Sequence, residues 1–111
     1  MTKTVEQNWE AIYTVAQNEA AKAQREYIQK YGEPMYCGFA WVNVPGTHPF
    51  TKWLKRTHPR AGHNGHPKGW EIWAPGLYNG QSMDIKEIGA RAFADVLEKH
   101  GITCYVGSRA D

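Results

Sequence analysis

The first part of the chain carries a single apolar stripe. Apolar side chains recur every three or four positions up to Tyr31, the spacing that places them on one face of a helix. Thr4 and Gln7 have the spacing of a capping box, and Gly32 is a typical C-terminal stop, so a long helix is predicted over residues 4–31. Alanines in the middle of the stripe predict a close approach to another surface. The stripe consists of Trp9, Ile12, Ala16, Ala20, Ala23 and Tyr27.

After this helix the apolar positions alternate with a period of two, as they do in strands. Residues 36–44 (YCGFAWVNV), 70–74 (WEIWA) and 102–109 are each predicted to form a strand, and a brief further strand is expected at 80–83. One face of the strands has mostly small or aliphatic side chains: Gly38, Ala40, Val42, Val44, Trp70, Ile72, Ala74, Ile102, Cys104 and Val106. The other face is aromatic and polar: Cys37, Phe39, Trp41, Asn43, Glu71, Trp73, Thr103, Tyr105 and Gly107.

Two shorter segments return to the helical period. Thr47 is placed to cap a helix over 49–56 with Phe50, Trp53 and Leu54 inward, and 84–100 is amphipathic up to a stop at Gly101. The fold class is therefore α+β. A long N-terminal helix is followed by a small ferredoxin-like (split βαβ) antiparallel sheet with two helices on one face. We expect a single domain, 1–111, in which 1–32 is the N-terminal helix and 33–111 is the α+β core, with a basic His/Gly-rich loop at 56–69.

Composition narrows the class of protein. The 111 residues are 41% hydrophobic and 13% aromatic, which fits one domain with one modest core and excludes a disordered chain. No apolar run approaches the ~20 residues of a membrane span, and the N-terminus lacks the apolar segment of a signal peptide. The two cysteines, Cys37 and Cys104, are too few for a disulfide-stapled secreted domain and favour a reducing cytosol. Both fall within predicted strands, so we expect them in the core.

Charge is distributed unevenly along the chain. Five basic residues and no carboxylate fall between Pro34 and Trp70, so this segment carries +5, and because the whole chain carries +2 the remainder carries −3. A basic lobe on a nearly neutral protein indicates an anionic partner, such as a nucleotide or nucleic acid; the alternative is an ordinary solvated loop. The candidate anion-binding residues are Lys52, Lys55, Arg56, Arg60 and Lys68.

The basic loop also raises the question of a metal site. His58, His63 and His66 could place three imidazoles around zinc. No cysteine or carboxylate lies in the loop, the spacing matches no known zinc pattern, and positive charge opposes a cation. Catalytic motifs such as GxSxG and HExxH are missing from the sequence. We therefore expect no catalytic residue, metal or cofactor. A metal-dependent hydrolase or nuclease using these histidines is the enzymatic alternative.

The aromatic strand face is the second candidate site. Phe39, Trp41, Trp73 and Tyr105 would share the face opposite the helices. Such a face needs cover, and the N-terminal helix or a second subunit is favoured over stacked bases of single-stranded RNA. We accordingly expect a homodimer. A purely structural oligomer is a further alternative.

Three segments, GEPMYCGFAWVNV, NGQSMD and the terminal GSRAD, resemble a group of small uncharacterised proteins of tailed bacteriophages. The resemblance spans most of the chain after Tyr31 and transfers no functional residues; residues 56–68 are the least like the group. It implies a phage gene product that acts in the cytoplasm of the bacterial host. Combined with the basic lobe, it leads us to expect a small non-enzymatic accessory protein for counter-defence or host takeover. Its partner would be a host protein, a nucleic acid or an anionic nucleotide-type ligand.

Overall fold

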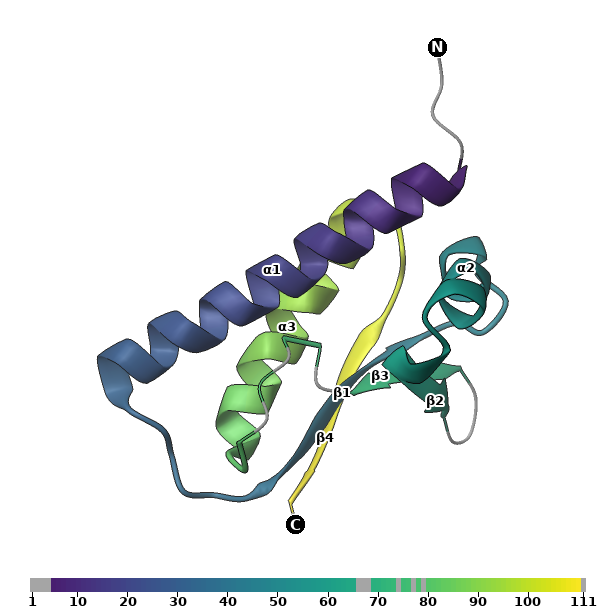
Figure 1. The fold of residues 1–111 in the computed structure, drawn as a ribbon. Coiled ribbons are helices and arrows are strands. Elements are labelled where there is room, and N and C mark those ends of the chain that lie inside the picture. The colour runs from purple at the N-terminus through teal and green to yellow at the C-terminus, as the bar shows by residue number, and fades with distance from the viewer. Residues whose placement is uncertain (1–4, 66–68, 74, 77, 79, 111) are drawn as a thin grey trace.

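A four-stranded antiparallel sheet with helices on one of its faces forms the centre of the protein (Figure 1). The structure is a computed structural model that describes residues 5–65, 69–73, 75–76, 78 and 80–110. The elements in chain order are α1 (Val5–Tyr31), β1 (Gly38–Val44), α2 (Pro49–Thr57), a short 3-10 helix η1 (Pro59–Ala61), β2 (Gly62–Asn64), β3 (Trp70–Trp73), α3 (Met83–Lys99) and β4 (Tyr105–Ala110). The α+β class is confirmed. None of the described helices has the length and apolar character of a membrane span.

The strand order is β2-β3-β1-β4, so β1 and β3 are the inner strands. Trp41 on β1 lies opposite Trp73 on β3 and opposite Gly107 on β4. The next row along the sheet pairs Asn43 with Glu71 and with Tyr105. This register places all five side-chain positions and Gly107 on one face, because residues two apart on a strand point the same way.

The opposite face of the sheet is buried under α3, and α1 packs on α3 in turn (Figure 1). The predicted inward residues of β1 and β3 are buried, as are the apolar residues of α3 that meet them. Ala16 and Ala20 of α1 have no exposed surface, which confirms the close approach that the alanine-rich stripe predicted. The main apolar contributors are Ala40, Val42, Val44, Ile72, Phe93, Leu97 and Ile102.

Side chains cap the starts of α3 and α2. The Ser82 hydroxyl accepts the Ile85 N–H at the start of α3. At α2 the cap is His48 and not Thr47: its Nδ1 accepts the Phe50 N–H at 3.0 Å. An imidazole nitrogen satisfies the same free helix N–H as a hydroxyl does, and Pro49 begins the helix without an N–H of its own. The expected capping pair of α1 lies outside the described residues.

One short strand of the sheet lies elsewhere than the sequence predicts. Residues 80–83, where a brief strand was expected, form none, and only an isolated bridge joins Ser82 to Cys37. The short strand is instead β2, which lies inside the predicted loop at 56–69 and pairs with β3. A strand of three residues is too short to show an apolar alternation, so the sequence reading took it for a polar connection.

The two cysteines lie in different environments, and only one of them is in the core. Cys104 is buried, just before β4, whereas Cys37 is exposed. The prediction that both are core residues is therefore wrong for Cys37. The prediction failed because Cys37 lies just before β1 and alternates with Phe39 and Trp41, on the face opposite the buried one.

Candidate functional site

The aromatic face of the sheet is not covered by the N-terminal helix. Trp9 of α1 contacts the rings of His48 and Phe50, and Tyr13 contacts Phe93, all on the buried side. Of the two covers that the sequence left open, α1 is therefore not the one, because its apolar stripe packs on α3 and α2. On the uncovered face Tyr105 is 71% exposed. The predicted partners Phe39, Trp41 and Trp73 are half-buried.

Two tryptophans form the centre of this face. The rings of Trp41 and Trp73 stack with their centroids 4.9 Å apart and an interplanar angle of 15°. Phe39 extends the cluster, with its centroid 5.5 Å from Trp73. The indole of Trp41 also leans over β4, where a Cβ at Gly107 would lie 2.6 Å from the ring. Glycine at this position thus makes room for the Trp41 ring.

Glu71 holds the tryptophan pair in place. It lies on the same face but is only 8% exposed, and its Oε1 accepts the Trp73 indole N–H at 3.0 Å. His63 of β2 completes the group: its Nε2 is 4.0 Å from the same oxygen, and its ring lies 5.5 Å from Trp73. Sequence reasoning did not select Glu71 as a site residue, although the alternation had placed it beside Trp73.

Cations border the face at the Phe39 end. The Arg109 guanidinium lies 5.6 Å from the centre of the Phe39 ring and the Lys86 ammonium 4.9 Å from it. Lys86 also donates to the Gly38 carbonyl at 2.8 Å. Neither residue was selected from the sequence, because Lys86 belongs to α3 and Arg109 lies near the C-terminus. The register of β1 with β4 brings Arg109 opposite Phe39.

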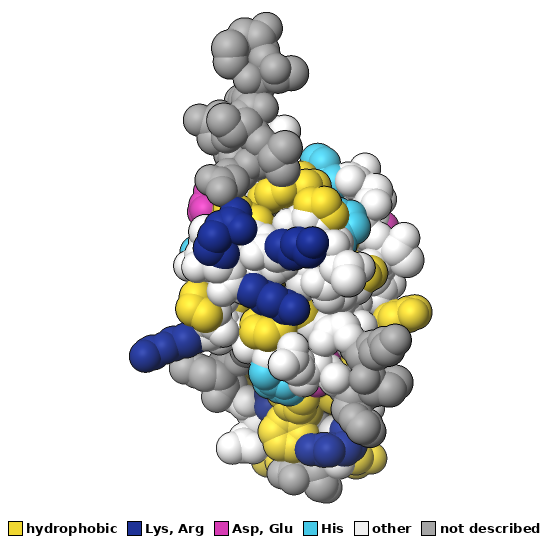
Figure 2. Space-filling model, turned by 90° about the vertical axis from the view of Figure 1, so that its right-hand side faces the viewer, with side chains coloured by type: hydrophobic (Ala, Val, Ile, Leu, Met, Phe, Trp, Pro, Cys, Tyr) yellow, Lys and Arg dark blue, Asp and Glu magenta, His cyan; other side chains and the backbone are white. Residues whose placement is uncertain are grey.

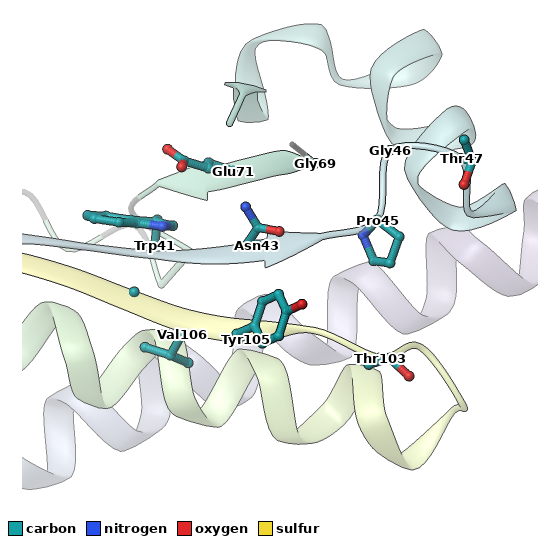
Figure 3. Close-up of a pocket in the computed structure, with 11 residues that line it drawn as sticks. Trp41, Asn43, Pro45, Gly46, Thr47, Gly69, Glu71, Thr103, Tyr105 and Val106 are labelled. Atoms are coloured by element: carbon teal, nitrogen blue, oxygen red, sulfur yellow. The ribbon is translucent and has the colours of Figure 1, made fainter. Parts of the chain in front are cut away.

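A depression of about 830 Å³ opens at the other end of the face (Figure 3). Trp41 and Glu71 lie at one end of it, Gly46 and Thr47 at the other, and Tyr105 along its side. The depression is lined by Trp41, Asn43, Pro45, Gly46, Thr47, Gly69, Glu71, Thr103, Tyr105, Val106 and Gly107.

The basic lobe is a surface of α2 and η1 in the described part of the chain. Figure 2 views this side of the molecule and shows Lys and Arg side chains gathered over its upper part, with few acidic side chains among them. Lys52, Arg56 and Arg60 are exposed, and the Lys55 ammonium lies 5.3 Å from the centre of the Trp70 ring. Lys68 lies outside the described residues. Lys55 does not line the depression but lies next to a residue that does, because a Cβ on Gly46 would lie 3.7 Å from the Lys55 Nζ.

The candidate metal residues are not brought together. His58 lies on the buried side, where its ring packs on Tyr13 and Trp53 and its Nε2 is 3.7 Å from Glu10. His63 lies on the uncovered face, and His66 is outside the described residues. Among residues 5–65, 69–73, 75–76, 78 and 80–110, no three His, Cys, Asp or Glu side chains group as a metal site requires.

The buried thiol is also unsuited to nucleophilic chemistry. Burial raises the pKa of Cys104 to about 12, with smaller contributions from Glu98 and Asp95. Its thiol donates to the Ala94 carbonyl at 3.7 Å. A thiol that stays protonated at neutral pH is a poor nucleophile, so Cys104 is a packing residue.

Comparison with known proteins does not identify the site. No protein-family model, curated protein or solved structure matches the chain. The function must therefore be argued from the uncovered face, the depression and the charges around them.

Proposed function

We propose that this chain is a non-enzymatic binding protein that holds single-stranded nucleic acid on the uncovered face of its sheet. The observation that carries the proposal is the stacked pair of Trp41 and Trp73, which lies half-exposed on the two inner strands beside Phe39 and Tyr105. Unpaired bases stack on such rings, and each stack contributes about 1–3 kcal/mol. Aromatic side chains on an open four-stranded sheet are a recurring platform for single strands.

The charges around the face fit a phosphate backbone. Arg109 and Lys86 lie at the Phe39 end, and Lys55 lies beside the depression at the other end. A single strand that crosses the aromatic rings would therefore meet cations at both ends. The exposed charges of α2 would add long-range attraction, because each neutralised phosphate releases counterions.

The element order supports the finer fold assignment, which we also propose. After α1 the chain runs β1-α2-β2-β3-α3-β4, and the sheet order is β2-β3-β1-β4. This is the element order of the ferredoxin-like split βαβ fold. In that arrangement the inner strands are the ones that carry the tryptophan pair here. Strand β3 takes the third-strand position that the sequence predicts for residues 80–83, and β2 takes the second-strand position that it predicts for residues 70–74.

The biological setting is proposed from the phage resemblance. An accessory protein of a tailed phage would meet host or phage single strands in the bacterial cytoplasm, where binding could serve counter-defence or host takeover. A homodimer through the aromatic face is the competing use of the same rings. Since a second copy and a nucleic acid would exclude each other there, the two are separable by experiment.

The test compares a fluorescently labelled single strand of about ten nucleotides with its duplex, by anisotropy at two salt concentrations. We expect the single strand to bind more tightly than the duplex. Tyr105→Ala should weaken binding about fivefold or more, whereas Tyr31→Ala should leave it unchanged, because Tyr31 is similarly exposed (64%) but ends α1. Equal affinity for duplex, or equal effects of the two variants, would overturn the proposal. A dimer that persists under saturating oligonucleotide and is broken by Tyr105→Ala would make a second copy the occupant.

A further inference from the structure

We infer that the depression beside Tyr105 is a subsite for one nucleotide unit, with its base between Trp41 and Tyr105 and its phosphate on Lys55. This inference rests on the proposed function and names the part of the face that recognises charge and base together. It selects Lys55, among the residues of the basic lobe, as the one that contacts the bound unit directly.

The walls of the depression suit a flat ring. Trp41 and Tyr105 occupy neighbouring rows on adjacent strands, since Trp41 lies opposite Gly107 and Tyr105 lies opposite Asn43. The Trp41 ring occupies the space over Gly107, and both residues line the depression. The volume of about 830 Å³ is within the range of small-ligand sites and exceeds the need of a base alone. Space therefore remains for the sugar and phosphate.

Charge gives the depression a direction. At the Trp41 end lies the carboxylate of Glu71, which is only 8% exposed and which repels a phosphate. At the Gly46 end lies the ammonium of Lys55, which attracts one. The phosphate of a bound unit would accordingly lie toward Gly46 and Thr47, and the base toward Glu71 (Figure 3). An exocyclic amino group on the base would donate a further hydrogen bond to the carboxylate, which already accepts the Trp73 indole N–H.

Lys55 is prepared for this role by its packing. It is half-buried with its ammonium over the Trp70 ring, so its long side chain is already restrained near Gly46. Restraint before binding lowers the entropic cost of the contact. Lys52 lies one turn earlier on α2 and is exposed. It therefore provides a control of equal charge on the same helix.

The experiment measures the binding of adenosine and of its 5′- and 3′-monophosphates by NMR titration, following the Trp indole N–H signals. We expect the wild type to bind at least one monophosphate about tenfold more tightly than adenosine, which corresponds to one charge-assisted contact. Lys55→Met keeps the apolar stem over Trp70 and should abolish this preference while leaving adenosine binding unchanged. Lys52→Met should retain the preference. Tyr105→Ala should weaken all three ligands, whereas Tyr105→Phe should not.

The outcomes separate the subsite from the proposed function. If the single strand binds the face but Lys55→Met and Lys52→Met behave alike toward the monophosphates, the subsite is wrong and the proposed function stands. The subsite is also wrong if the wild type shows no preference for a phosphate. If neither the single strand nor any mononucleotide binds, the proposed function fails as well.

Discussion

Gly107→Ala is the substitution that tests the aromatic platform most directly. In an ordinary strand position this change stabilises a protein by about 0.4–1 kcal/mol, because alanine loses less backbone entropy on folding than glycine does. Here the new Cβ would lie 2.6 Å from the Trp41 indole. The ring must turn away, and the stacked contact with Trp73 is then lost.

The expected magnitudes follow from these two opposing terms. Loss of an aromatic pair costs about 0.5–1.5 kcal/mol, and the entropy gain offsets part of it, so the free energy of unfolding should stay within about 1 kcal/mol of wild type. Binding of a single strand should weaken by about 1–3 kcal/mol, the contribution of one stacked base. A variant that folds almost normally and binds poorly is the signature of a displaced platform residue.

The assay combines urea unfolding, anisotropy with the labelled single strand, and the indole N–H signals of Trp41 and Trp73. Ser108→Ala is the control, since Ser108 is the exposed neighbour on β4 and alternation directs it to the other face. Both indole signals should shift in Gly107→Ala and neither in Ser108→Ala. If Gly107→Ala raises the free energy of unfolding by the full amount of about 0.4–1 kcal/mol expected from backbone entropy and shifts neither indole signal, the Trp41 ring does not lie over β4. If the ring moves but binding is unchanged, the stacked pair is not the platform.

Four further outcomes are expected. The double change Lys52→Ser and Arg60→Ser should weaken binding of a single strand and lower the magnitude of the slope of log K against log salt by about 0.7 per lost phosphate contact. The free energy of unfolding should stay within ~1 kcal/mol of wild type, and an unchanged slope would contradict phosphate binding by the basic lobe. Deletion of the three residues of β2 should cost about 1–3 kcal/mol in urea unfolding, because three cross-strand pairs with β3 are lost, and an unaffected midpoint would contradict the pairing. Sedimentation at high micromolar concentration and without oligonucleotide tests the homodimer that the sequence analysis expects: a species of twice the 12.6 kDa of the chain would support this competing use of the face, and a monomer would refute it. A thiol reagent at pH 8 should modify one cysteine in the folded protein and two in urea, because Cys37 is exposed whereas burial raises the pKa of Cys104 to about 12; fast modification of both in the folded state would contradict the burial.

The helices and the two faces of the sheet could be predicted from the sequence because their signals are local. Apolar residues recur every three or four positions in α1 and α3 and every second position in β1 and β3. This spacing indicates which face of each helix or strand is buried. The alternation in WEIW and in FAWVN therefore placed Trp41 and Trp73 correctly on one face. It also placed Glu71 there, but the hydrogen bond from the Trp73 indole could not be read from spacing alone.

Contacts between distant segments could not be predicted in this way. Strand β2 has three residues, and only its pairing with β3 makes it a strand. The position of α1 could not be predicted either, because an apolar stripe indicates that a helix face is buried but does not identify the element that buries it. Trp9 and Tyr13 could have covered the aromatic face; they pack instead on α2 and α3, whose own apolar faces needed cover. His58 was assigned to the basic loop, and considered as a ligand only in the metal alternative, for the same reason; tertiary packing places it between Tyr13 and Trp53.

The two strongest signals in the sequence, the basic segment and the aromatic alternation, come together at the turn after β1. Chain reversal at Pro45 and Gly46 returns α2 to the end of the sheet, so Lys55 lies beside a residue that lines the depression. A stacked ring binds a base of any kind, and a basic patch attracts any anion, so each signal alone specifies little. Their meeting is more selective, because a ligand must offer a flat ring and a negative charge at a fixed separation. A nucleotide unit satisfies both conditions, whereas an apolar protein surface satisfies only the first and an inorganic anion only the second. For this reason the geometry at Lys55 favours nucleic acid over a second copy of the chain as the occupant of this end of the face.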